Sequence, residues 1–471
     1  MTRTLAVAAY ALFGSLLAWS RLSGLGTGGY CCDEIRTVAD SVRAGPETIF
    51  TGVYTPNNHM LYSLLGWATS AVVGESEVVL RMGAAIPFIV GVVVVTAWLD
   101  IRVDALAAVF YLALATFSPL LLDLSRLARG YGLAFLAMSV MIVAALEAVR
   151  SGRGWTVAAF WAAGVVGAWT LPHFAIPFGA VGIALLLRPE LRGRCLIGGA
   201  LSVAAIALWY GPRFDDIRAA SSQDYGKPID AAWLLTAPSD QVLFPAFVSL
   251  DETVVNPSFV TLAVAVALAV VLGSSPLLHR GASAAILGAA IASTLLAFWI
   301  SGTGVVPRFL SFLLVPLLVL MATGCAAVLR RWRKRSTLVQ TGIVLVVVAV
   351  VVTMTTPFLA SVPRERRDSL REAAAVIREQ APSSAPVYAF MPYSTDLAFH
   401  LGRSVHQLSR SADPAVVCHS GRTSVYVAQP WFWPAAPIPG CVTRRGTRQH
   451  RFEHYARGGE LDLWIIPAAD A

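Results

Sequence analysis

Long apolar runs constrain this chain more than any other feature of its sequence. There are 11 of them, and each approaches the roughly 20 residues that a transmembrane helix needs. They occupy about 4–20, 78–98, 103–122, 131–149, 155–170, 173–187, 195–211, 258–275, 283–300, 305–328 and 338–359. Of the 471 residues, 56% are hydrophobic and only 14% are charged, whereas soluble domains carry about 25% charged residues. The sequence therefore predicts a membrane protein with several spans and excludes a water-soluble globule or a disordered chain.

Basic residues in the loops between these runs predict the orientation of the chain. If a further run, 58–73, does not cross the membrane, five short loops with 12 basic residues share one side. These residues are Arg102, Arg150, Arg153, Arg188, Arg192, Arg194, Arg280, Arg330, Arg331, Arg333, Lys334 and Arg335. The positive-inside rule places such loops in the cytoplasm. We therefore expect 11 spans in the plasma membrane, a cytoplasmic N-terminus, and an amphipathic or re-entrant segment 58–73 along the outer surface.

Charge divides the chain into a membrane module and a water-facing domain. Residues 1–360 contain 41 Asp, Glu, Lys and Arg residues, and residues 361–471 contain the other 23. We predict a transmembrane catalytic module over 1–360, with outer loops 21–77 and 212–257, and an extracytoplasmic domain over 361–471. In this domain Leu370, Ala373, Ala374 and Ile377 recur at helical spacing. Short strand-like runs follow at 387–390, 424–428 and 461–466. The predicted fold class is an all-α polytopic membrane protein with a small C-terminal α/β extracytoplasmic domain.

Cysteine usage and net charge limit the kinds of site and binding partner that we expect. The six cysteines form no C-x-x-C pair, so a zinc ribbon or a thioredoxin-like site is not expected. Cys418 and Cys441 lie in the polar tail and can form a disulfide if the tail faces an oxidising compartment. The net charge of +8 would suit a nucleic-acid binder, but most excess arginine lies in the short loops. We therefore predict membrane lipids, and no nucleic acid, as partners.

Polar residues of the first outer loop are candidates for chemistry. Asp33 and Glu34 follow the first span, and a carboxylate there can act as a general base toward a hydroxyl nucleophile. Solvated charges at the membrane surface are the alternative interpretation. Asn58, His59 and Tyr62 suit sugar or acceptor hydroxyls, or else form an interfacial belt. A divalent metal held by His59 with the two acids stays open, although the spacing matches no standard motif.

Several arginines lie at the outer ends of different spans and are candidates for phosphate binding. They are Arg81, Arg126, Arg129 and Arg308. A planar guanidinium can hold phosphate oxygens bidentately, and the alternative is that these side chains reach the lipid headgroups. His173 lies at an outer turn, where it either contacts a sugar or has a structural role.

Other functional classes receive less support. The sequence contains neither a G-x-x-x-x-G-K-[ST] loop nor a G-x-S-x-G elbow, which disfavours nucleotide-driven transport and α/β-hydrolase chemistry. A transporter or flippase of lipid-linked saccharides typically has repeated halves and polar groups near the middle of the bilayer. This chain shows no internal repeat and collects its polar groups at one membrane face, which favours an enzyme. A non-catalytic receptor or assembly factor that uses the tail is the third alternative.

Four motifs in order resemble the GT-C superfamily of membrane glycosyltransferases. Asp33-Glu34 matches the acidic motif after the first span, and residues 57–62 (NNHMLY) resemble a His-Pro-Leu-Tyr-type outer segment. Residues 79–85 (VLRMGAA) and 118–131, from Ser-Pro to Arg-Gly-Tyr, resemble two further family segments, and 306–310 (VPRFL) resembles a later Pro-Arg-Tyr element. Within this superfamily, the sequence most resembles the branch of protein O-mannosyltransferases and lipid A aminoarabinose transferases. Met60 and Leu127 depart from it, where relatives often have Pro and Glu.

This resemblance implies a GT-C-like fold and an inverting transfer of a sugar from a polyprenyl-phosphate donor to a glycan, lipid or protein acceptor. Asp33 would be the base that deprotonates the acceptor hydroxyl, with Glu34 assisting it. Arg81, Arg129 and Arg308 would hold the donor phosphate. We expect the acids and the arginines to meet in one pocket at the outer lipid–water boundary.

Overall fold

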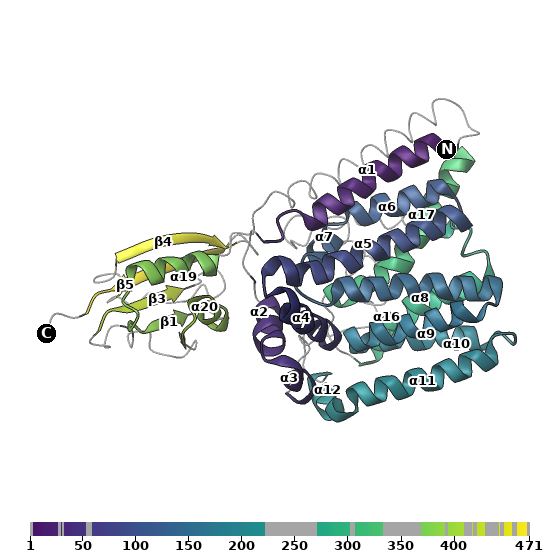
Figure 1. The fold of residues 1–471 in the computed structure, drawn as a ribbon. Coiled ribbons are helices and arrows are strands. Elements are labelled where there is room, and N and C mark those ends of the chain that lie inside the picture. The colour runs from purple at the N-terminus through teal and green to yellow at the C-terminus, as the bar shows by residue number, and fades with distance from the viewer. Residues whose placement is uncertain are drawn as a thin grey trace. The chain divides into compact units, whose positions relative to one another are not determined.

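The computed structural model divides the chain into two compact units. It describes residues 3–26, 30, 33–52, 59–221, 271–301, 307–332, 369–390, 394–408, 417, 422–428, 442, 447–454 and 459–468. The first unit comprises Met1–Leu25 with Ser41–Pro363, and the second comprises Gly26–Asp40 with Arg364–Ala471. The first is built of helices and the second contains the sheet (Figure 1).

Long apolar helices dominate the first unit. They are α1 (Arg3–Leu22), α5 (Glu77–Arg102), α8 (Tyr131–Ser151), α9 (Gly154–Thr170), α11 (Arg192–Tyr210), α16 (Gly281–Ser301) and α17 (Leu314–Trp332). The shorter helical segments are α3 (Gly45–Thr51), α4 (Met60–Val73), α6 (Ala105–Phe117), α7 (Pro119–Ser125), η2 (Pro172–Phe174), α10 (Ala175–Leu186), η3 (Gly211–Arg213), α12 (Phe214–Ser221) and η5 (Pro307–Leu313).

The helix lengths show a membrane protein. Among the described residues, six helices are long and apolar enough to cross a membrane, and one bent pair would make a seventh. The predicted runs 258–275 and 338–359 lie largely or wholly outside the described residues, so the total of 11 spans stays a prediction. Segment 58–73 contains α4, whose 14 residues extend about 21 Å. This is shorter than the hydrocarbon core of about 30 Å, as expected for a segment that does not cross.

One predicted run is broken where we expected a continuous span. Residues 103–122 form α6 and α7, which meet at 67°. The break follows from two adjacent residues. Pro119 has no backbone N–H to continue the helix, and the hydroxyl of Ser118 accepts a hydrogen bond from the Leu121 N–H at 3.3 Å, so a new helix begins there.

Loops that carry the predicted cytoplasmic arginines lie at one end of the helical unit. Arg194 donates a hydrogen bond to the Gly152 carbonyl at 2.6 Å, which joins the loop after α8 to the start of α11. Arg330 pairs with Asp104, which joins the end of α17 to the start of α6. The contacts agree with the prediction that these loops share one side of the membrane.

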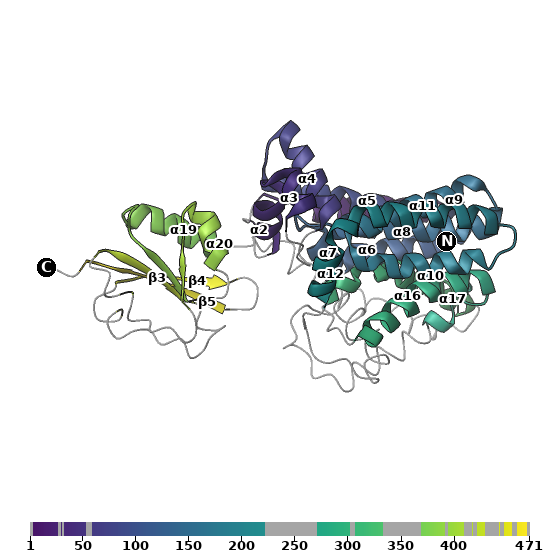
Figure 2. The same ribbon diagram turned by 90° about the horizontal axis from the view of Figure 1, so that it is seen from below.

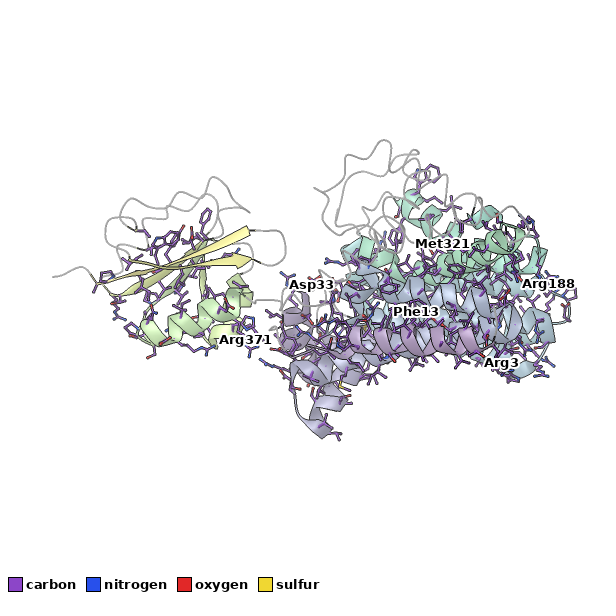
Figure 3. All side chains as sticks on the ribbon, turned by 90° about the horizontal axis from the view of Figure 1, so that it is seen from above. Arg3, Phe13, Asp33, Arg188, Met321 and Arg371 are labelled. Atoms are coloured by element: carbon purple, nitrogen blue, oxygen red, sulfur yellow. The ribbon has the colours of Figure 1, made fainter. Side chains whose placement is uncertain are left out.

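The first helix runs from this end to the opposite one. Figure 3 shows Arg3, at the start of α1, at the same end of the unit as Arg188. At the other end of α1, Arg21 is fully buried and donates hydrogen bonds to the carbonyls of Ala115 and Thr116 at 2.9 and 3.0 Å. These bonds fix the C-terminal end of α1 against the end of α6.

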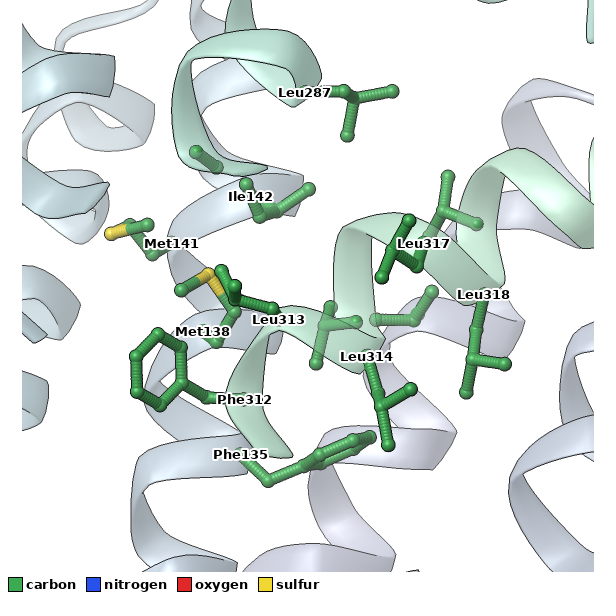
Figure 4. Packing of buried hydrophobic residues seen from close by; sticks show 14 of the residues in the cluster. Phe135, Met138, Met141, Ile142, Leu287, Phe312, Leu313, Leu314, Leu317 and Leu318 are labelled. Carbon is green, nitrogen blue, oxygen red and sulfur yellow. The ribbon is translucent and has the colours of Figure 1, made fainter. Parts of the chain in front are cut away.

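Helix α8 lies at the centre of the bundle. Most of its side chains are buried, and Figure 4 shows them interleaved with side chains of α16, η5 and α17. The packed residues are Phe135, Met138, Met141, Ile142, Leu287, Phe312, Leu313, Leu314, Leu317 and Leu318. Gly132 lets α8 approach α5 closely, because a Cβ there would lie 2.0 Å from the Ala84 carbonyl oxygen. This packing sets the position of the N-terminal end of α8.

The second unit is a small α/β domain together with residues 26–40. Its elements are α2 (Asp33–Thr37), η1 (Val38–Val42, which continues into the first unit), α19 (Ser369–Gln380), β1 (Val387–Phe390), α20 (Ser394–Leu401), β2 (His406–Gln407), β3 (Ser424–Ala428), β4 (Thr447–His454) and β5 (Gly459–Ile466). The predicted helix and the three predicted strands are therefore confirmed, and α20, β2 and β4 are additions. Cys418 and Cys441 lie outside the described residues, so their disulfide stays a prediction.

The sheet has the order β2-β1-β3-β5-β4. Strand β1 pairs in parallel with β2 and β3, whereas β5 is antiparallel to β3 and β4. Helices α19 and α20 cover one face (Figure 2), where Val425 and Val427 of β3 pack with Ile377 and Leu397. Tyr426 points to the other face and packs in a second apolar cluster, as the alternation of side chains along a strand requires.

Candidate functional site

Basic side chains from four separate segments converge in the first unit. His59 precedes α4, Arg129 precedes α8, His173 lies in η2 and Arg308 lies in η5. The charges of Arg129, His173 and Arg308 all act on His59. Helices α8 and α9 place this cluster at the end of the bundle opposite to the arginine-bearing loops. The sequence prediction that these residues share one membrane face is in keeping with this placement.

His59 and Arg129 form the buried centre of this cluster, and each is only 1% exposed. The Gly130 N–H donates a hydrogen bond to Nδ1 of His59 at 2.8 Å, and Nη2 of Arg129 lies 3.0 Å from Nε2. Burial, and then the Arg129 guanidinium, lower the pKa of His59 well below its ordinary value. The imidazole is therefore neutral near pH 7, and because Nδ1 accepts, its proton is on Nε2.

Two hydrogen-bond donors therefore face each other at the centre of the site. Neither the Nε2–H of His59 nor the Nη2 of Arg129 can accept a hydrogen bond from the other. Donors that converge in a buried, positively charged site are the arrangement that binds an anion. Phosphate and carboxylate oxygens have the acceptor capacity and the negative charge to bind beside this pair of donors.

Gly130 is required for this close approach. A Cβ at this position would lie 2.6 Å from Cγ2 of Thr170 at the end of α9 and 2.8 Å from Nδ1 of His59. Glycine thus allows the backbone that begins α8 to touch the imidazole directly. The Gly130 carbonyl also accepts a hydrogen bond from the Ala134 N–H at 2.9 Å, which starts α8 at this point.

Tyr131 contributes an aromatic wall with a polar end. Its ring meets the His59 ring edge to face at 4.9 Å, and Cζ of Arg129 lies 5.1 Å from its centroid. Its hydroxyl is buried and makes no hydrogen bond to any part of the chain that the structure describes. A buried hydroxyl normally has a partner, so this group is a further candidate donor to a ligand.

His173 and Arg308 are linked through the backbone of η5. Nε2 of His173 donates a hydrogen bond to the Phe309 carbonyl at 3.0 Å, and Phe309, Phe298 and Phe312 surround the imidazole. Arg308 is partly buried, and its Cζ lies 5.9 Å from the Phe309 ring centroid. His173 therefore fixes the segment that carries Arg308.

Arg81 and Tyr62 make contacts with the backbone near the site. Nη1 of Arg81 donates to the Leu25 carbonyl at 2.7 Å, and Nη1 also lies 3.8 Å from a carboxylate oxygen of Glu77. The Tyr62 hydroxyl donates to the Leu80 carbonyl at 2.6 Å. These bonds hold the chain after α1 and the start of α5. The predicted roles of Arg81 in phosphate binding and of Tyr62 in acceptor binding stay predictions.

The acid pair belongs to the second unit. Asp33, labelled in Figure 3, and Glu34 begin α2, where Glu34 is fully buried and Asp33 is partly buried. Thr37 closes this short helix by donating its hydroxyl hydrogen to the Asp33 carbonyl at 3.0 Å. Because the arginines belong to the first unit, the meeting of acids and arginines stays a prediction. Asn58 lies outside the described residues.

Residues that could hold a metal ion do not form a cluster in the described part of the chain. No group of three or more His, Cys, Asp or Glu side chains is placed there to bind one. The expectation of a possible divalent metal therefore receives no candidate site from the described residues.

Three residues of this site were not predicted from the sequence. Gly130 and Tyr131 entered only as letters of a motif, and Thr170 was not singled out. An arginine, a glycine and an aromatic residue in succession at the start of an apolar run were the available signal for the first two. No local pattern could have indicated Thr170, because its contact with Gly130 depends on how α8 and α9 pack.

Comparison with known proteins identifies the fold. No family model matches this sequence, and no curated protein matches it. The crystal structure of ArnT from Cupriavidus metallidurans in the apo state is similar with a TM-score of 0.61 at 15% identity, covering 98% of both chains. The same protein bound to undecaprenyl phosphate gives 0.56 at 15% identity and covers 97% of both. The archaeal oligosaccharyltransferase AglB from Archaeoglobus fulgidus, in complex with an inhibitory peptide and a dolichol-phosphate, gives 0.55 at 11% identity, covering 90% of this chain and 69% of that chain.

The likeness to ArnT extends over almost the whole chain, including the α/β domain at its end. At identities of 11–15% these likenesses show the fold and no more. ArnT and AglB are both members of the GT-C superfamily. The resemblance that the sequence motifs predicted is thus confirmed at the level of the fold.

Proposed function

We propose, from its GT-C fold, that the chain is an inverting glycosyltransferase, which moves a sugar from a polyprenyl-phosphate donor to an acceptor hydroxyl at the outer face of the membrane. Two of the similar structures support a donor of this class, since one contains undecaprenyl phosphate and the other a dolichol-phosphate. No nucleotide-binding loop occurs in the sequence. A donor carried by a lipid requires none.

The observation that carries this proposal is the convergence of two donors at a buried point. Nη2 of Arg129 and the protonated Nε2 of His59 lie 3.0 Å apart, and an oxygen of the donor phosphate that lies to one side of this pair can accept from both. The buried hydroxyl of Tyr131 and the guanidinium of Arg308 supply further donors at the same site. Because His59 and Arg129 are buried, each of these donors interacts with a phosphate more strongly than it would in water.

The reaction needs a phosphate that leaves and a hydroxyl that attacks. The acceptor oxygen attacks the anomeric carbon from the face opposite to the phosphate, and a new carbon–oxygen bond forms. The bond between that carbon and the phosphate oxygen breaks, and the polyprenyl phosphate leaves with the electron pair. Arg129, His59 and Arg308 stabilise the charge that develops on the phosphate.

Asp33 is the proposed general base of this reaction. Its carboxylate takes the proton of the acceptor hydroxyl as the new bond forms, and Glu34 positions or assists it. A single displacement of this kind inverts the configuration of the anomeric carbon. Arg81 is proposed to act on the donor phosphate, and Asn58, Tyr62 and His173 on the sugar or the acceptor.

Reconstitution tests the proposal directly. The purified full-length chain in lipid nanodiscs is given polyprenyl-phosphate sugars and envelope extracts, and transfer is followed by mass spectrometry. We expect transfer by the wild type and a loss of transfer in Asp33→Asn that leaves undecaprenyl phosphate binding intact. Transfer that survives in Asp33→Asn would remove Asp33 from the role of base.

The same preparation separates the proposal from the alternative of a flippase or transporter. Movement of a lipid-linked saccharide between leaflets by both wild type and Asp33→Asn, without any transfer, would support the transporter. A comparison of envelope glycans and glycoproteins from cells with and without the gene then identifies the acceptor.

A further inference from the structure

A segment far away in the sequence contacts the C-terminal domain. Residues 26–40, which contain the acid pair, form one compact unit with residues 364–471. The acid pair therefore shares a unit with the α/β domain, although some 330 residues lie between them along the chain. The domain can therefore influence the position of the acid motif.

Tyr30 is the point of contact. Its side chain is only 5% exposed, and its ring packs edge to face on Phe399 of α20 at a centroid distance of 6.3 Å. The carbonyl oxygen of Tyr30 lies 3.1 Å from Nε2 of His400, the next residue of α20. Since a carbonyl only accepts, Nε2 of His400 carries the proton and donates it.

Helix α20 is itself held by the rest of the domain. The Arg378 guanidinium of α19 donates a hydrogen bond to the His400 carbonyl at 2.8 Å. Leu397 and Leu401 of α20 are buried in the apolar cluster that contains α19 and the sheet. Phe399 and His400, which contact Tyr30, therefore belong to a helix that the rest of the domain holds in place.

The contacts of Tyr30 with α20 limit where the acid motif can lie. Asp33 follows three residues later and can lie at most about 11 Å from Tyr30, since an extended chain covers about 3.3–3.6 Å per residue. Asp33 and Glu34 begin α2, a helix of 5 residues, which is too short to be stable by itself. Its position depends on what holds its ends.

We propose that α20 positions the acid motif for catalysis, with His400 and Phe399 as positioning residues. This inference rests on the proposed function, in which Asp33 is the base. It assigns the C-terminal domain a role in turnover, as opposed to a role in binding the acceptor. A displacement of about 1 Å in a catalytic group can slow a reaction by about 100-fold.

The experiment compares three histidine variants of the full-length chain in nanodiscs. His400→Ala removes the donor to Tyr30, and His400→Gln keeps an N–H donor of similar reach. His406→Ala is the matched control, because His406 is exposed on β2 and stacks on Tyr388 at 5.2 Å. Hydrogen–deuterium exchange of residues 33–37 reports the hold on α2, and binding of undecaprenyl phosphate and sugar transfer are measured on the same samples.

We expect His400→Ala to speed exchange in residues 33–37 by about 5-fold, as the loss of one hydrogen bond predicts. We expect transfer to slow by about 10-fold to 100-fold with binding of undecaprenyl phosphate unchanged. His400→Gln and His406→Ala should resemble the wild type. Phe399→Leu, which removes the ring contact and keeps an apolar side chain, should change exchange and transfer in the same direction and serves if His400→Ala does not fold.

Unaltered exchange in both His400→Ala and Phe399→Leu, or faster exchange with normal transfer, would overturn this inference alone. A wild type that transfers no sugar from any donor would overturn the proposed function and, with it, the catalytic role of α20. The two failures are thus distinguishable, because exchange does not depend on turnover.

Discussion

Replacement of Arg129 is the perturbation that separates a ligand-binding role from a structural one. Arg129→Gln keeps much of the side-chain volume and removes the charge from a residue that is 1% exposed. A buried donor that stabilises a developing negative charge contributes about 2.7–4 kcal/mol. We therefore expect Arg129→Gln to slow sugar transfer by about 100-fold to 1000-fold and to weaken binding of undecaprenyl phosphate.

The fold should tolerate this change better than the activity does. Arg129→Gln loses the cation–π contact with Tyr131, which lies 5.1 Å away and is worth up to about 2 kcal/mol when desolvated. The glutamine amide keeps N–H donors on the side of His59, whose Nε2 lies 3.0 Å from Nη2 of Arg129, and this limits the loss. Arg129→Lys keeps the charge without the planar fork and should have an intermediate effect.

Arg21→Gln is the matched control for Arg129→Gln. Arg21 is also buried at the same end of the bundle and also lies over an aromatic ring, that of Phe88 at 5.2 Å. Its hydrogen bonds, however, go to backbone carbonyls at the end of α6. We expect Arg21→Gln to lower the melting temperature and to preserve the affinity of the folded protein for undecaprenyl phosphate. Native mass spectrometry and thermal unfolding in nanodiscs measure the two quantities, and wild-type affinity in Arg129→Gln would refute the reasoning.

Three further predictions concern the same site. Gly130→Ala places a Cβ 2.8 Å from Nδ1 of His59 and should lower the free energy of unfolding by about 1–3 kcal/mol. Its control is Gly179→Ala, whose Cβ meets nothing within 4 Å and which should be at least as stable as the wild type. Tyr131→Phe removes a hydroxyl that makes no hydrogen bond within the described residues, so the melting temperature should hold while binding of undecaprenyl phosphate weakens by about 1.5–3 kcal/mol. In the folded protein the pKa of His59 lies below its ordinary value of 6.5, so the unfolded chain takes up a proton first as the pH falls. The contribution of this group to stability is therefore complete above about pH 6.5 and declines below it. We expect the decline in melting temperature to be smaller in His59→Gln.

Each of these expectations has an outcome that contradicts it. Equal stability of Gly130→Ala and the wild type would mean that the turn before α8 does not touch the imidazole. Unchanged lipid binding in Tyr131→Phe would exclude its hydroxyl from the phosphate site. A melting temperature that is independent of pH between about pH 7 and pH 5, or one that declines equally in His59→Gln, would show that His59 is not buried in its neutral form.

Much of the fold follows from local patterns. The ends of α5, α8 and α9 agree with the predicted runs within a few residues, because each run is bounded by polar residues that cannot enter the lipid. In the domain, the spacing of Leu370 and Ile377 identified α19. Strand β4 was missed because its sequence, TRQHRFEH, has no apolar alternation; it exists because β5 offers it a partner.

The site could be predicted only in outline. Residue types and their place at the ends of spans indicated which side chains share a membrane face. The pairing of His59 with Gly130 joins residues that are 71 positions apart, and it depends on how α8, α9 and the start of α4 pack. The hydrogen bond from Arg81 to the Leu25 carbonyl likewise has no local signal, since an arginine with a backbone partner and one with a phosphate partner look alike in a sequence.

A structure of the full-length protein in nanodiscs with undecaprenyl phosphate tests the central claim most directly. We expect the phosphate to lie within hydrogen-bonding distance of both Nη2 of Arg129 and Nε2 of His59, with the Asp33 carboxylate facing the same cavity. A phosphate bound elsewhere on the bundle, or an Asp33 that faces away from it, would contradict the account.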